Sequence, residues 1–286
     1  MKKIAIALLL IMFQFQCFSQ ELEHISLKYQ GFDREYWLYV PENVSEERPL
    51  VVLLHGYGGS AEGYRPEMVK CAAENGFVLC IPQGYKDKTG EAGWNVGYPD
   101  QEGMKTDDVA FVEYLVRRVC GKYDLNRSNV FLTGMSNGGE MCYLMAVRKP
   151  ELFRAIASVS GLTMGWIVKN LPLPCRPVAF MEIHGTADKV SLWEGDPHNN
   201  EGWGEYTSVD MAMSRITAMN RCTYSTVEEM PRKSESSRRI LLHRYLGGEK
   251  ETLLYEVEDG PHSWFLDDID TVSEIWHFFE RQMKCN

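Results

Sequence analysis

The segment that most constrains the fold of this chain is Gly134-Met135-Ser136-Asn137-Gly138-Gly139. The run at 129–133 before it is short, apolar and partly β-branched, which predicts a buried strand, and residues 140–149 after it predict a helix that stops at Pro150. A G-x-S-x-G sequence between a strand and a helix is typical of a nucleophile elbow, in which the turn is too tight for bulky neighbours. The turn raises the Ser136 hydroxyl above the sheet, and the helix N-terminus offers N–H groups to a developing negative charge.

Strand and helix patterns alternate along the rest of the chain. Residues 24–29 and 35–40 predict an antiparallel hairpin. Further strands are expected at 50–55, 77–81, 155–159, 178–183, 239–246 and 252–257, and helices at 65–75, 106–122, 209–220 and 271–283. This alternation predicts an α/β fold with a mostly parallel central sheet and helices on both faces. In such a sheet, ligands bind at the carboxyl ends of the strands.

The N-terminus is typical of an export signal. Lys2 and Lys3 form a basic start, and the apolar run at 4–13 is too short to span a bilayer. We expect cleavage after Ser19, which leaves residues 20–286 as one catalytic domain of an exported protein. A lipoprotein anchored at Cys17 is the alternative. No later stretch predicts a transmembrane helix.

Composition narrows the classes of partner. The 286 residues suffice for one large domain, and a formal net charge of −10 argues against nucleic acid and anionic membrane surfaces as partners. Seven cysteines follow the predicted signal, so disulfides are permitted but their pairing stays open. The cysteine spacings contain no paired C-x-x-C, which argues against a zinc or iron–sulfur site.

A serine nucleophile needs a base and an orienting acid. In α/β hydrolases these follow in the order Ser, Asp or Glu, His. His262 comes after the last predicted strand and before the last helix, so it is the expected base; His243, His277 and His198 are weaker candidates. Asp188 follows strand 178–183 and is the expected acid, with Asp196 and Asp210 as alternatives.

The oxyanion hole requires two backbone donors. One is expected to be the N–H of Asn137, directly after the nucleophile. The loop Leu54-His55-Gly56-Tyr57-Gly58-Gly59 follows an early strand, and its glycines let the backbone approach a substrate. The N–H of Tyr57 is therefore the second predicted donor, whereas His55 is expected to order the loop.

Four motifs together resemble the feruloyl-esterase and polyhydroxybutyrate-depolymerase branch of the α/β hydrolases, which includes the first carbohydrate-esterase family. They are His55-Gly56-Tyr57-Gly58-Gly59, the elbow at 134–139, His184-Gly185-Thr186-Ala187-Asp188 and Gly260-Pro261-His262-Ser263-Trp264. The segments 36–41, 93–95 and 107–111 also match this pattern. The resemblance implies catalytic roles for Ser136, Asp188 and His262, and an ester substrate without a metal or organic cofactor.

The chain departs from that family pattern in two places. It inserts residues 192–206, and it lacks a cysteine between Cys222 and His262 that depolymerase-like members would have. Aromatic rings near the predicted mouth could stack on a hydroxycinnamoyl group or a sugar. The expected substrate-binding side chains are Trp94, Trp193, Trp203 and Trp264, each of which could instead pack in the core.

Two further groups of acidic residues have structural interpretations. Asp107 and Asp108 are expected to cap a helix rather than to act as an acid–base pair, and Glu140 to complement the dipole of the helix after Ser136.

Three functions follow as hypotheses. The first is a secreted serine carboxylesterase that releases feruloyl or acetyl groups from plant cell-wall polysaccharide through an acyl-enzyme. The second is a hydrolase of polyhydroxybutyrate or short polyester oligomers, or a peptidase, on the same scaffold. The third is a non-catalytic glycan-binding protein with a hydrolase fold. The acyl group, the glycan, the oligomeric state and whether the insert acts as a lid stay open.

Overall fold

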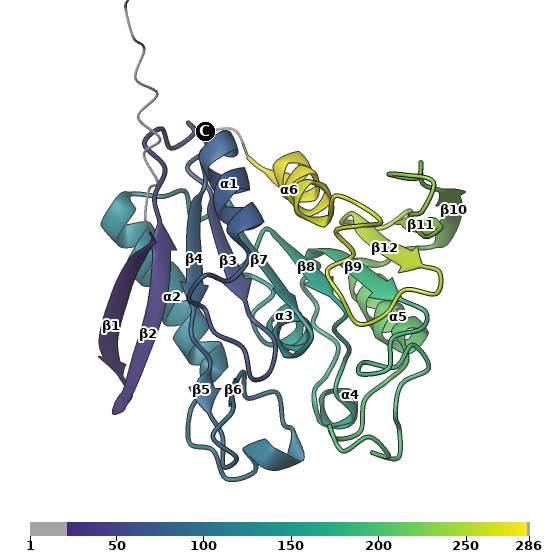
Figure 1. The fold of residues 1–286 in the computed structure, drawn as a ribbon, viewed down its shortest axis with the longest axis horizontal. Coiled ribbons are helices and arrows are strands. Elements are labelled where there is room, and N and C mark those ends of the chain that lie inside the picture. Colours follow the sequence, from purple (N-terminus) through teal and green to yellow (C-terminus); the bar gives the residue numbers. More distant parts are fainter. Residues whose placement is uncertain (1–21, 285–286) are drawn as a thin grey trace, which may run out of the picture.

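A ten-stranded sheet runs through the computed structural model, which describes residues 22–284 (Figure 1). Its strand order is β1-β2-β4-β3-β7-β8-β9-β12-β11-β10. The strands are β1 Glu23–Tyr29, β2 Phe32–Tyr39, β3 Leu50–Leu54, β4 Val78–Pro82, β7 Val130–Met135, β8 Ala155–Val159, β9 Ala179–Gly185, β10 Tyr224–Glu229, β11 Ile240–Leu246 and β12 Thr252–Val257. The six central strands, β4 to β12 in this order, are parallel, and both margins are antiparallel.

Helices cover both faces of the sheet. They are α1 Pro66–Asn75, α2 Asp108–Tyr123, α3 Asn137–Arg148, α4 Gly165–Asn170, α5 Val209–Asn220 and α6 Thr271–Gln282. Each central strand is buried on both sides, so alternate residues enter two separate cores. One core is shared with α2, α3 and α5, and the other with α1 and α6. The predicted α/β fold with a mostly parallel sheet is confirmed.

Most predicted elements occur within a few residues of their expected places. The hairpin at 24–40, the strands at 155–159 and 252–257 and the helix at 209–220 are clear cases. The sequence patterns missed the short helix α4, the edge strand β10 and a small two-stranded sheet of β5 Tyr85–Lys86 and β6 Ala92–Gly93. β10 lies at the margin of the sheet with all six of its residues exposed, so it lacks the apolar alternation that reveals a strand.

Three sequence predictions concern the N-terminal signal, membrane-spanning helices and disulfide bonds. The predicted signal at 1–19, including Cys17, lies outside the described residues and stays a prediction. Among residues 22–284 no helix has the length and apolar character needed to cross a membrane. The six described cysteines are all free thiols, at positions 71, 80, 120, 142, 175 and 222.

Candidate active site

Ser136 occupies a strained turn between β7 and α3. Its backbone has φ 57° and ψ −124°, a conformation that L-residues rarely adopt. Its N–H donates to the carbonyl of Val159 at the end of β8 (2.9 Å), and its carbonyl accepts the N–H of Glu140 (2.8 Å). The side chain is half-buried rather than enclosed. The structure therefore has the strand–turn–helix geometry that the elbow sequence predicts.

Glycines on either side of Ser136 allow the close packing of this turn. A Cβ at Gly134 would lie 2.7 Å from the backbone of Gly138, and one at Gly138 would lie 2.5 Å from the carbonyl oxygen of Leu54. Neither distance is sterically tolerable, so only glycine fits at both positions. The same packing brings the loop after β3 against the elbow, where a Cβ at Gly56 would lie 3.4 Å from the Cβ of Ser136.

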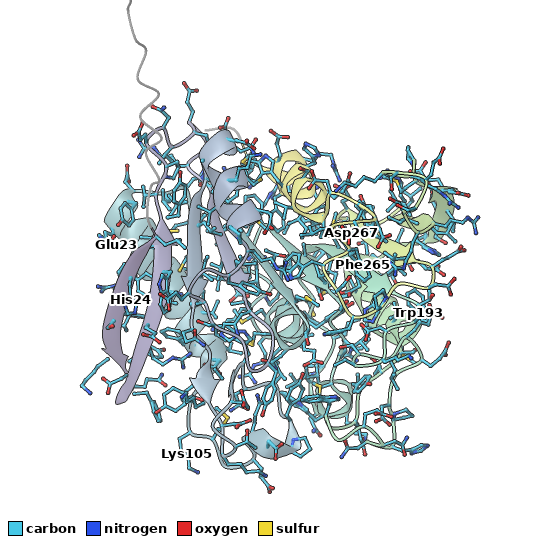
Figure 2. The ribbon with its side chains drawn as sticks, in the orientation of Figure 1. Glu23, His24, Lys105, Trp193, Phe265 and Asp267 are labelled. Atoms are coloured by element: carbon cyan, nitrogen blue, oxygen red, sulfur yellow. The ribbon has the colours of Figure 1, made fainter. Side chains whose placement is uncertain are left out.

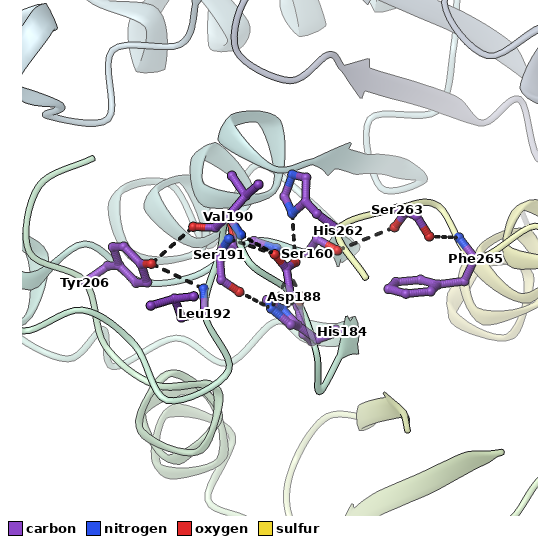
Figure 3. A network of polar contacts seen from close by, with 12 residues as sticks. Ser160, His184, Asp188, Val190, Ser191, Leu192, Tyr206, His262, Ser263 and Phe265 are labelled. Atoms are coloured by element: carbon purple, nitrogen blue, oxygen red, sulfur yellow. Dashed lines mark hydrogen bonds and ion pairs between the residues drawn. The ribbon is translucent and has the colours of Figure 1, made fainter. Parts of the chain in front are cut away.

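Asp188 and His262, the predicted acid and base, are hydrogen-bonded to each other. The Nδ1 of His262 lies 2.7 Å from Oδ2 of Asp188 (Figure 3), although the two residues are 74 positions apart in the chain. Because the carboxylate accepts the Nδ1–H, the Nε2 of His262 carries no proton and can act as a base. The Asp188 carboxylate is buried, while His262 keeps a 19% exposed side chain.

The loops that carry this pair are bound to each other. The N–H of Ala187 donates to the carbonyl of Gly260 (3.0 Å), and the N–H of Thr186 donates to the carbonyl of Val257 (3.0 Å). Gly185 and Gly260 are so close that a Cβ at Gly185 would lie 2.1 Å from the Gly260 carbonyl oxygen. Asp188 and His262 are thus positioned by two loops that pack as one unit at the ends of β9 and β12.

Ser136 and His262 lie on loops at the same edge of the sheet, but among the described residues the structure has no hydrogen bond between them. Catalytic hydrogen bonds often tighten only when a substrate is bound. The three residues come from the carboxyl ends of β7, β9 and β12, which the sheet order places on one side of β3.

The two predicted oxyanion donors lie on either side of the elbow. Asn137 is the first residue of α3, so no earlier helical turn supplies an acceptor for its N–H. Within residues 22–284, neither the Asn137 N–H nor the Tyr57 N–H is engaged in a hydrogen bond. Both amides are therefore available to an incoming oxyanion.

The loop that carries Tyr57 is held by a buried histidine. His55 Nδ1 donates to the carbonyl of Gly56 (2.7 Å), and its Nε2 accepts the N–H of Gly84 (2.9 Å). Gln83 contacts the same Nε2 (3.0 Å) and donates to the carbonyl of Gly59 (3.2 Å). Burial lowers the pKa of His55, which keeps the ring neutral and suited to this donor–acceptor pattern. The structure places His55 in the ordering role expected for it.

A second network fixes the side chain of Asn137. Its Oδ1 accepts the N–H of Trp94 (2.6 Å), and its Nδ2 donates to the carbonyl of the same residue (3.1 Å). Gln101 also donates to this carbonyl (2.7 Å), while its Oε1 accepts the N–H groups of Val96, Gly97 and Tyr98. The loop from 94 to 101 therefore clamps the residue directly after the nucleophile.

The four tryptophans expected to bind substrate divide into two pairs. Trp94 is fully buried, and its Nε1 donates to the carbonyl of His55 (2.9 Å). Trp264 is 2% exposed and donates to the hydroxyl of Tyr64 (3.3 Å). These two rings pack beneath the loops and donate hydrogen bonds to them, and substrate contact by either ring stays a prediction.

Trp193 and Trp203 lie on the insert and stay candidates for substrate contact because both are half-buried. Figure 2 shows Trp193 together with Phe265 in the half of the molecule formed by the C-terminal part of the chain. The ring of Trp203 packs edge-on against Tyr57 at a centroid distance of 5.5 Å. The insert therefore contacts the loop that supplies a predicted oxyanion donor.

The alternative acids and bases have other partners. Asp196 is buried and accepts N–H groups from His198 and Glu201, which orders the insert, and Asp210 is exposed in the first turn of α5. His243 bonds to Glu256 (2.7 Å), and His198 and His277 are exposed. None of them contacts the Asp188–His262 pair in the described residues.

The acidic pair at 107–108 is only half explained by capping. Asp107 caps α2 by accepting the N–H of Ala110 (2.9 Å). Asp108 is instead buried in an ion pair with Arg34 of β2 (2.7 Å) and accepts the N–H of Asn95 (2.8 Å). Its expected capping role is therefore corrected.

Glu140, which was expected to complement the helix dipole, also forms a specific hydrogen bond. It is buried and accepts a hydrogen bond from the hydroxyl of Tyr98, and burial raises its pKa to about 7.

A cavity of about 990 Å³ lies between the β1–β2 hairpin, the loop at 58–60 and the segment 83–92. Its lining contains neither Ser136 nor Asp188 nor His262, so volume alone would have pointed away from the site. Sequence reasoning also missed the half-buried Gln83 and the buried Gln101 and Glu182, since a polar side chain that acts through its hydrogen bonds has no motif of its own. Among the described residues no group of three or more His, Cys, Asp or Glu side chains could hold a metal ion.

Comparison with known proteins agrees with this geometry. Residues 34–172 match the family model described as Esterase PHB depolymerase. The chain is 29% identical over 172 residues to a probable feruloyl esterase C of Aspergillus flavus. This match covers 57% of this chain and 58% of that protein. It is 29% identical over 137 residues to a probable acetylxylan esterase A of Aspergillus clavatus, and this match covers 47% of this chain and 44% of that protein. The chain thus matches about half the length of these relatives.

Solved structures share the fold. The acetyl xylan esterase from Aspergillus awamori superposes with a TM-score of 0.61 at 17% identity, and the match covers 90% of this chain and 99% of that one. At this level of identity the similarity concerns the fold. The chain has the α/β-hydrolase fold, matches the family model described as Esterase PHB depolymerase over residues 34–172, and is similar to proteins named as probable feruloyl and acetylxylan esterases.

Proposed function

We propose that this protein is a serine carboxylesterase that works through an acyl-enzyme. The observation that carries the proposal is the Asp188–His262 hydrogen bond at the edge of the sheet where the Ser136 elbow lies. An elbow, an oriented imidazole and two free backbone amides are the parts that acyl transfer needs. The relatives named as esterases support the same class of reaction.

In the proposed mechanism, Ser136 Oγ attacks the acyl carbon while His262 Nε2 takes its proton. The N–H groups of Tyr57 and Asn137 stabilise the oxyanion, and Asp188 stabilises the imidazolium that forms. The imidazolium then protonates the leaving alcohol, which departs as the acyl-enzyme forms. A water molecule, deprotonated by His262, then attacks the acyl carbon, and the imidazolium returns the proton to Ser136 Oγ as the C–O bond breaks and the carboxylic acid leaves.

The substrate class that we propose is an acylated plant cell-wall polysaccharide carrying feruloyl or acetyl esters. Two relatives are named for such esters. The half-buried rings of Tyr57 and Trp203 pack against each other, and Tyr57 lies on the loop that contacts the Ser136 turn. These rings could stack on an aromatic acyl group or a sugar. The export signal predicted at 1–19 agrees with a substrate outside the cytoplasm.

A second candidate is hydrolysis of hydroxybutyrate or other short polyester oligomers. The family model that matches residues 34–172 is the observation that favours it. The mechanism is the same, and only the acyl and alcohol parts of the substrate differ.

A matched substrate panel tests these proposals. p-Nitrophenyl acetate, methyl ferulate, acetylated xylan and hydroxybutyrate oligomers are each offered to the wild type and to Ser136→Ala. We expect the wild type to cleave an ester and the variant to lose at least about 10³-fold in kcat. Methyl ferulate or acetylated xylan as best substrate supports the cell-wall proposal, and the oligomer supports the second candidate.

Retained activity in Ser136→Ala would contradict the mechanism. If the wild type cleaves no ester and a fluorophosphonate probe leaves Ser136 unlabelled, the third hypothesis, a glycan-binding protein on a hydrolase scaffold, replaces both.

A further inference from the structure

A second histidine lies behind the proposed catalytic acid. Oδ1 of Asp188 accepts the N–H groups of Val190 (2.8 Å) and Ser191 (2.9 Å). Oδ2 faces two imidazoles, His262 at 2.7 Å and His184 at 3.6 Å. Figure 3 shows the two rings on opposite sides of the carboxylate. The acid therefore contacts more than the one histidine that catalysis requires.

Both ring nitrogens of His184 have oxygen partners. Nε2 lies 2.8 Å from the carbonyl oxygen of Ser191, and Nδ1 lies 3.0 Å from Oε1 of Glu182. A carbonyl can only accept, so Nε2 carries a hydrogen. The remaining proton is shared between Nδ1 and the Glu182 carboxyl. Whichever group holds it, the pair as a whole is neutral, with its positive end toward Asp188 when the imidazole is charged.

The pair is completely buried. The side chains of Glu182 and His184 are both 0% exposed. They lie two residues apart on β9 and so point to the same face of the sheet. Burying ionisable groups is expensive, and well-packed apolar residues of similar volume are often at least as stabilising. Stability alone therefore poorly explains an ion pair on β9, directly before the loop that carries Asp188.

We propose that Glu182 and His184 are positioning residues: Glu182 orients His184, whose Nε2–H side faces Oδ2 of Asp188 and keeps that carboxylate directed at His262. This inference rests on the proposed esterase function, since it concerns the acid of the same site. Neither residue touches the reacting atoms. The pair acts only through Asp188.

The groups around the pair support this direction of charge. Burial by itself lowers the pKa of His184, but the hydrogen bond and charge of Glu182, together with Asp188, raise it overall. Burial raises the pKa of Glu182, and its hydrogen bond to His184 opposes that rise. From α3, Glu140 faces His184, and Cys142 and Tyr143 face Glu182.

Two neighbouring strands complete the surroundings. Ser158 of β8 is in register with Glu182, and Glu256 of β12 is in register with His184. The Glu256 carboxylate contacts His243 (2.7 Å). Ser158 is buried and carries no charge, and Glu256 is bonded to His243. Glu182 is therefore the carboxylate that bonds to His184 Nδ1.

The test is the isosteric change Glu182→Gln, which keeps a hydrogen-bonding group beside Nδ1 but removes the carboxylate. With His184 then neutral, the positive charge beside Asp188 and His262 disappears. We expect kcat to fall about tenfold with KM nearly unchanged. Removing a nearby positive charge favours protonation of the base, so the acidic limb of the kcat/KM profile should move to higher pH by about half a unit. His184→Gln tests the same contact independently and should shift the limb in the same direction.

Glu35→Gln is the matched control. It removes the carboxylate from another Glu–His pair, Glu35–His24 at 2.9 Å, on the β1–β2 hairpin. This control should leave kcat and the acidic limb unchanged. A folded Glu182→Gln protein with a wild-type acidic limb overturns the inference.

A readout without substrate separates this inference from the proposed function. The Nδ1 proton of His262, bonded to Asp188, should give a low-field proton resonance in the wild type. The resonance should shift or broaden in Glu182→Gln and stay in place in Glu35→Gln. If no ester is cleaved by the wild type, the proposed function fails, and an unchanged resonance in Glu182→Gln overturns the positioning role as well.

Discussion

At the scale of single residues, the site depends on buried polar groups whose partners are specific. Asn137 supplies a predicted oxyanion N–H, and its side chain is clamped at the backbone of Trp94. Three residues further along α3, Glu140 accepts the hydroxyl of Tyr98. These contacts join the first turn of the helix to the loop over it, so the geometry of the oxyanion site depends on their protonation and packing.

Glu140 gives a prediction about pH and stability. Burial raises its pKa to about 7, above the ordinary value of 4.5 that applies when the chain is unfolded. The folded protein then binds the proton more tightly, so stability is lost as the pH rises between these two values. Glu140→Gln removes this loss. Relative to the wild type, its free energy of unfolding should rise by about 2.5 kcal/mol between about pH 5 and about pH 8.

Urea unfolding at the two pH values measures this change. Glu62→Gln, at an exposed position, is the control and should show no such gain. An equal stability difference between Glu140→Gln and the wild type at both pH values would contradict the assignment.

Residues carried by motifs were easier to predict than residues that act through burial. The positions of Ser136, Asp188 and His262 follow from strand ends and from the glycines around them, which the sequence displays. Trp94 and Trp264 were expected to contact substrate because their neighbours lie at the site. The structure buries both, since exposure depends on how loops pack and not on residue type. Glu182 was missed because a polar residue within an apolar run shows no partner in the sequence.

At the scale of elements, the insert at 192–206 is an ordered part of the wall beside the elbow. Asp196 and Tyr206 exchange backbone hydrogen bonds (3.0 and 3.2 Å), and the Tyr206 hydroxyl accepts the N–H of Leu192 (3.2 Å). Trp203 packs against both Tyr57 and Tyr98, at 5.5 Å from each ring centroid, and the two tyrosine rings also contact each other at 5.7 Å. Aromatic packing thus connects the insert to both loops around the oxyanion site.

Trp203→Ala should change selectivity more than chemistry. The variant loses a ring beside Tyr57, so we expect kcat/KM for methyl ferulate to fall about tenfold, and that for p-nitrophenyl acetate to fall much less. Trp37→Ala, which removes a ring stacked on His24 in the β1–β2 hairpin, is the control and should leave the ratio unchanged. An unchanged ratio in Trp203→Ala would place the acyl group elsewhere.

At the scale of the whole molecule, a buried ion pair joins the N-terminal strands to the helix layer. Arg34 of β2 contacts Asp108 at the start of α2, and its guanidinium lies 3.8 Å from the ring centroid of Phe111. Asp108 also holds the N–H of Asn95 in the loop that clamps Asn137. One carboxylate therefore links the margin of the sheet, a helix and the candidate site.

The neighbouring residues Asp107 and Asp108 allow the contribution of this ion pair to the free energy of unfolding to be tested. Asp108→Asn leaves a buried arginine without its counter-charge, so it should lower the free energy of unfolding by about 3–5 kcal/mol. Asp107→Asn keeps a good N-cap and should change it by less than about 0.5 kcal/mol. Thermal or urea unfolding of both variants measures the difference, and equal effects would show that the ion pair does not carry this stability.

The separation of the site residues along the chain also has a consequence for folding. Asp188 and His262 meet across 74 positions, and the Asp188 loop is pinned to the loop after β12, the last strand of the sheet. Contacts between distant segments form only after slow loop closure. The contacts of the Ser136 turn involve only residues as far as Val159, whereas the contacts of His262 also need β12. Catalytic competence would then arise as one of the last events of folding.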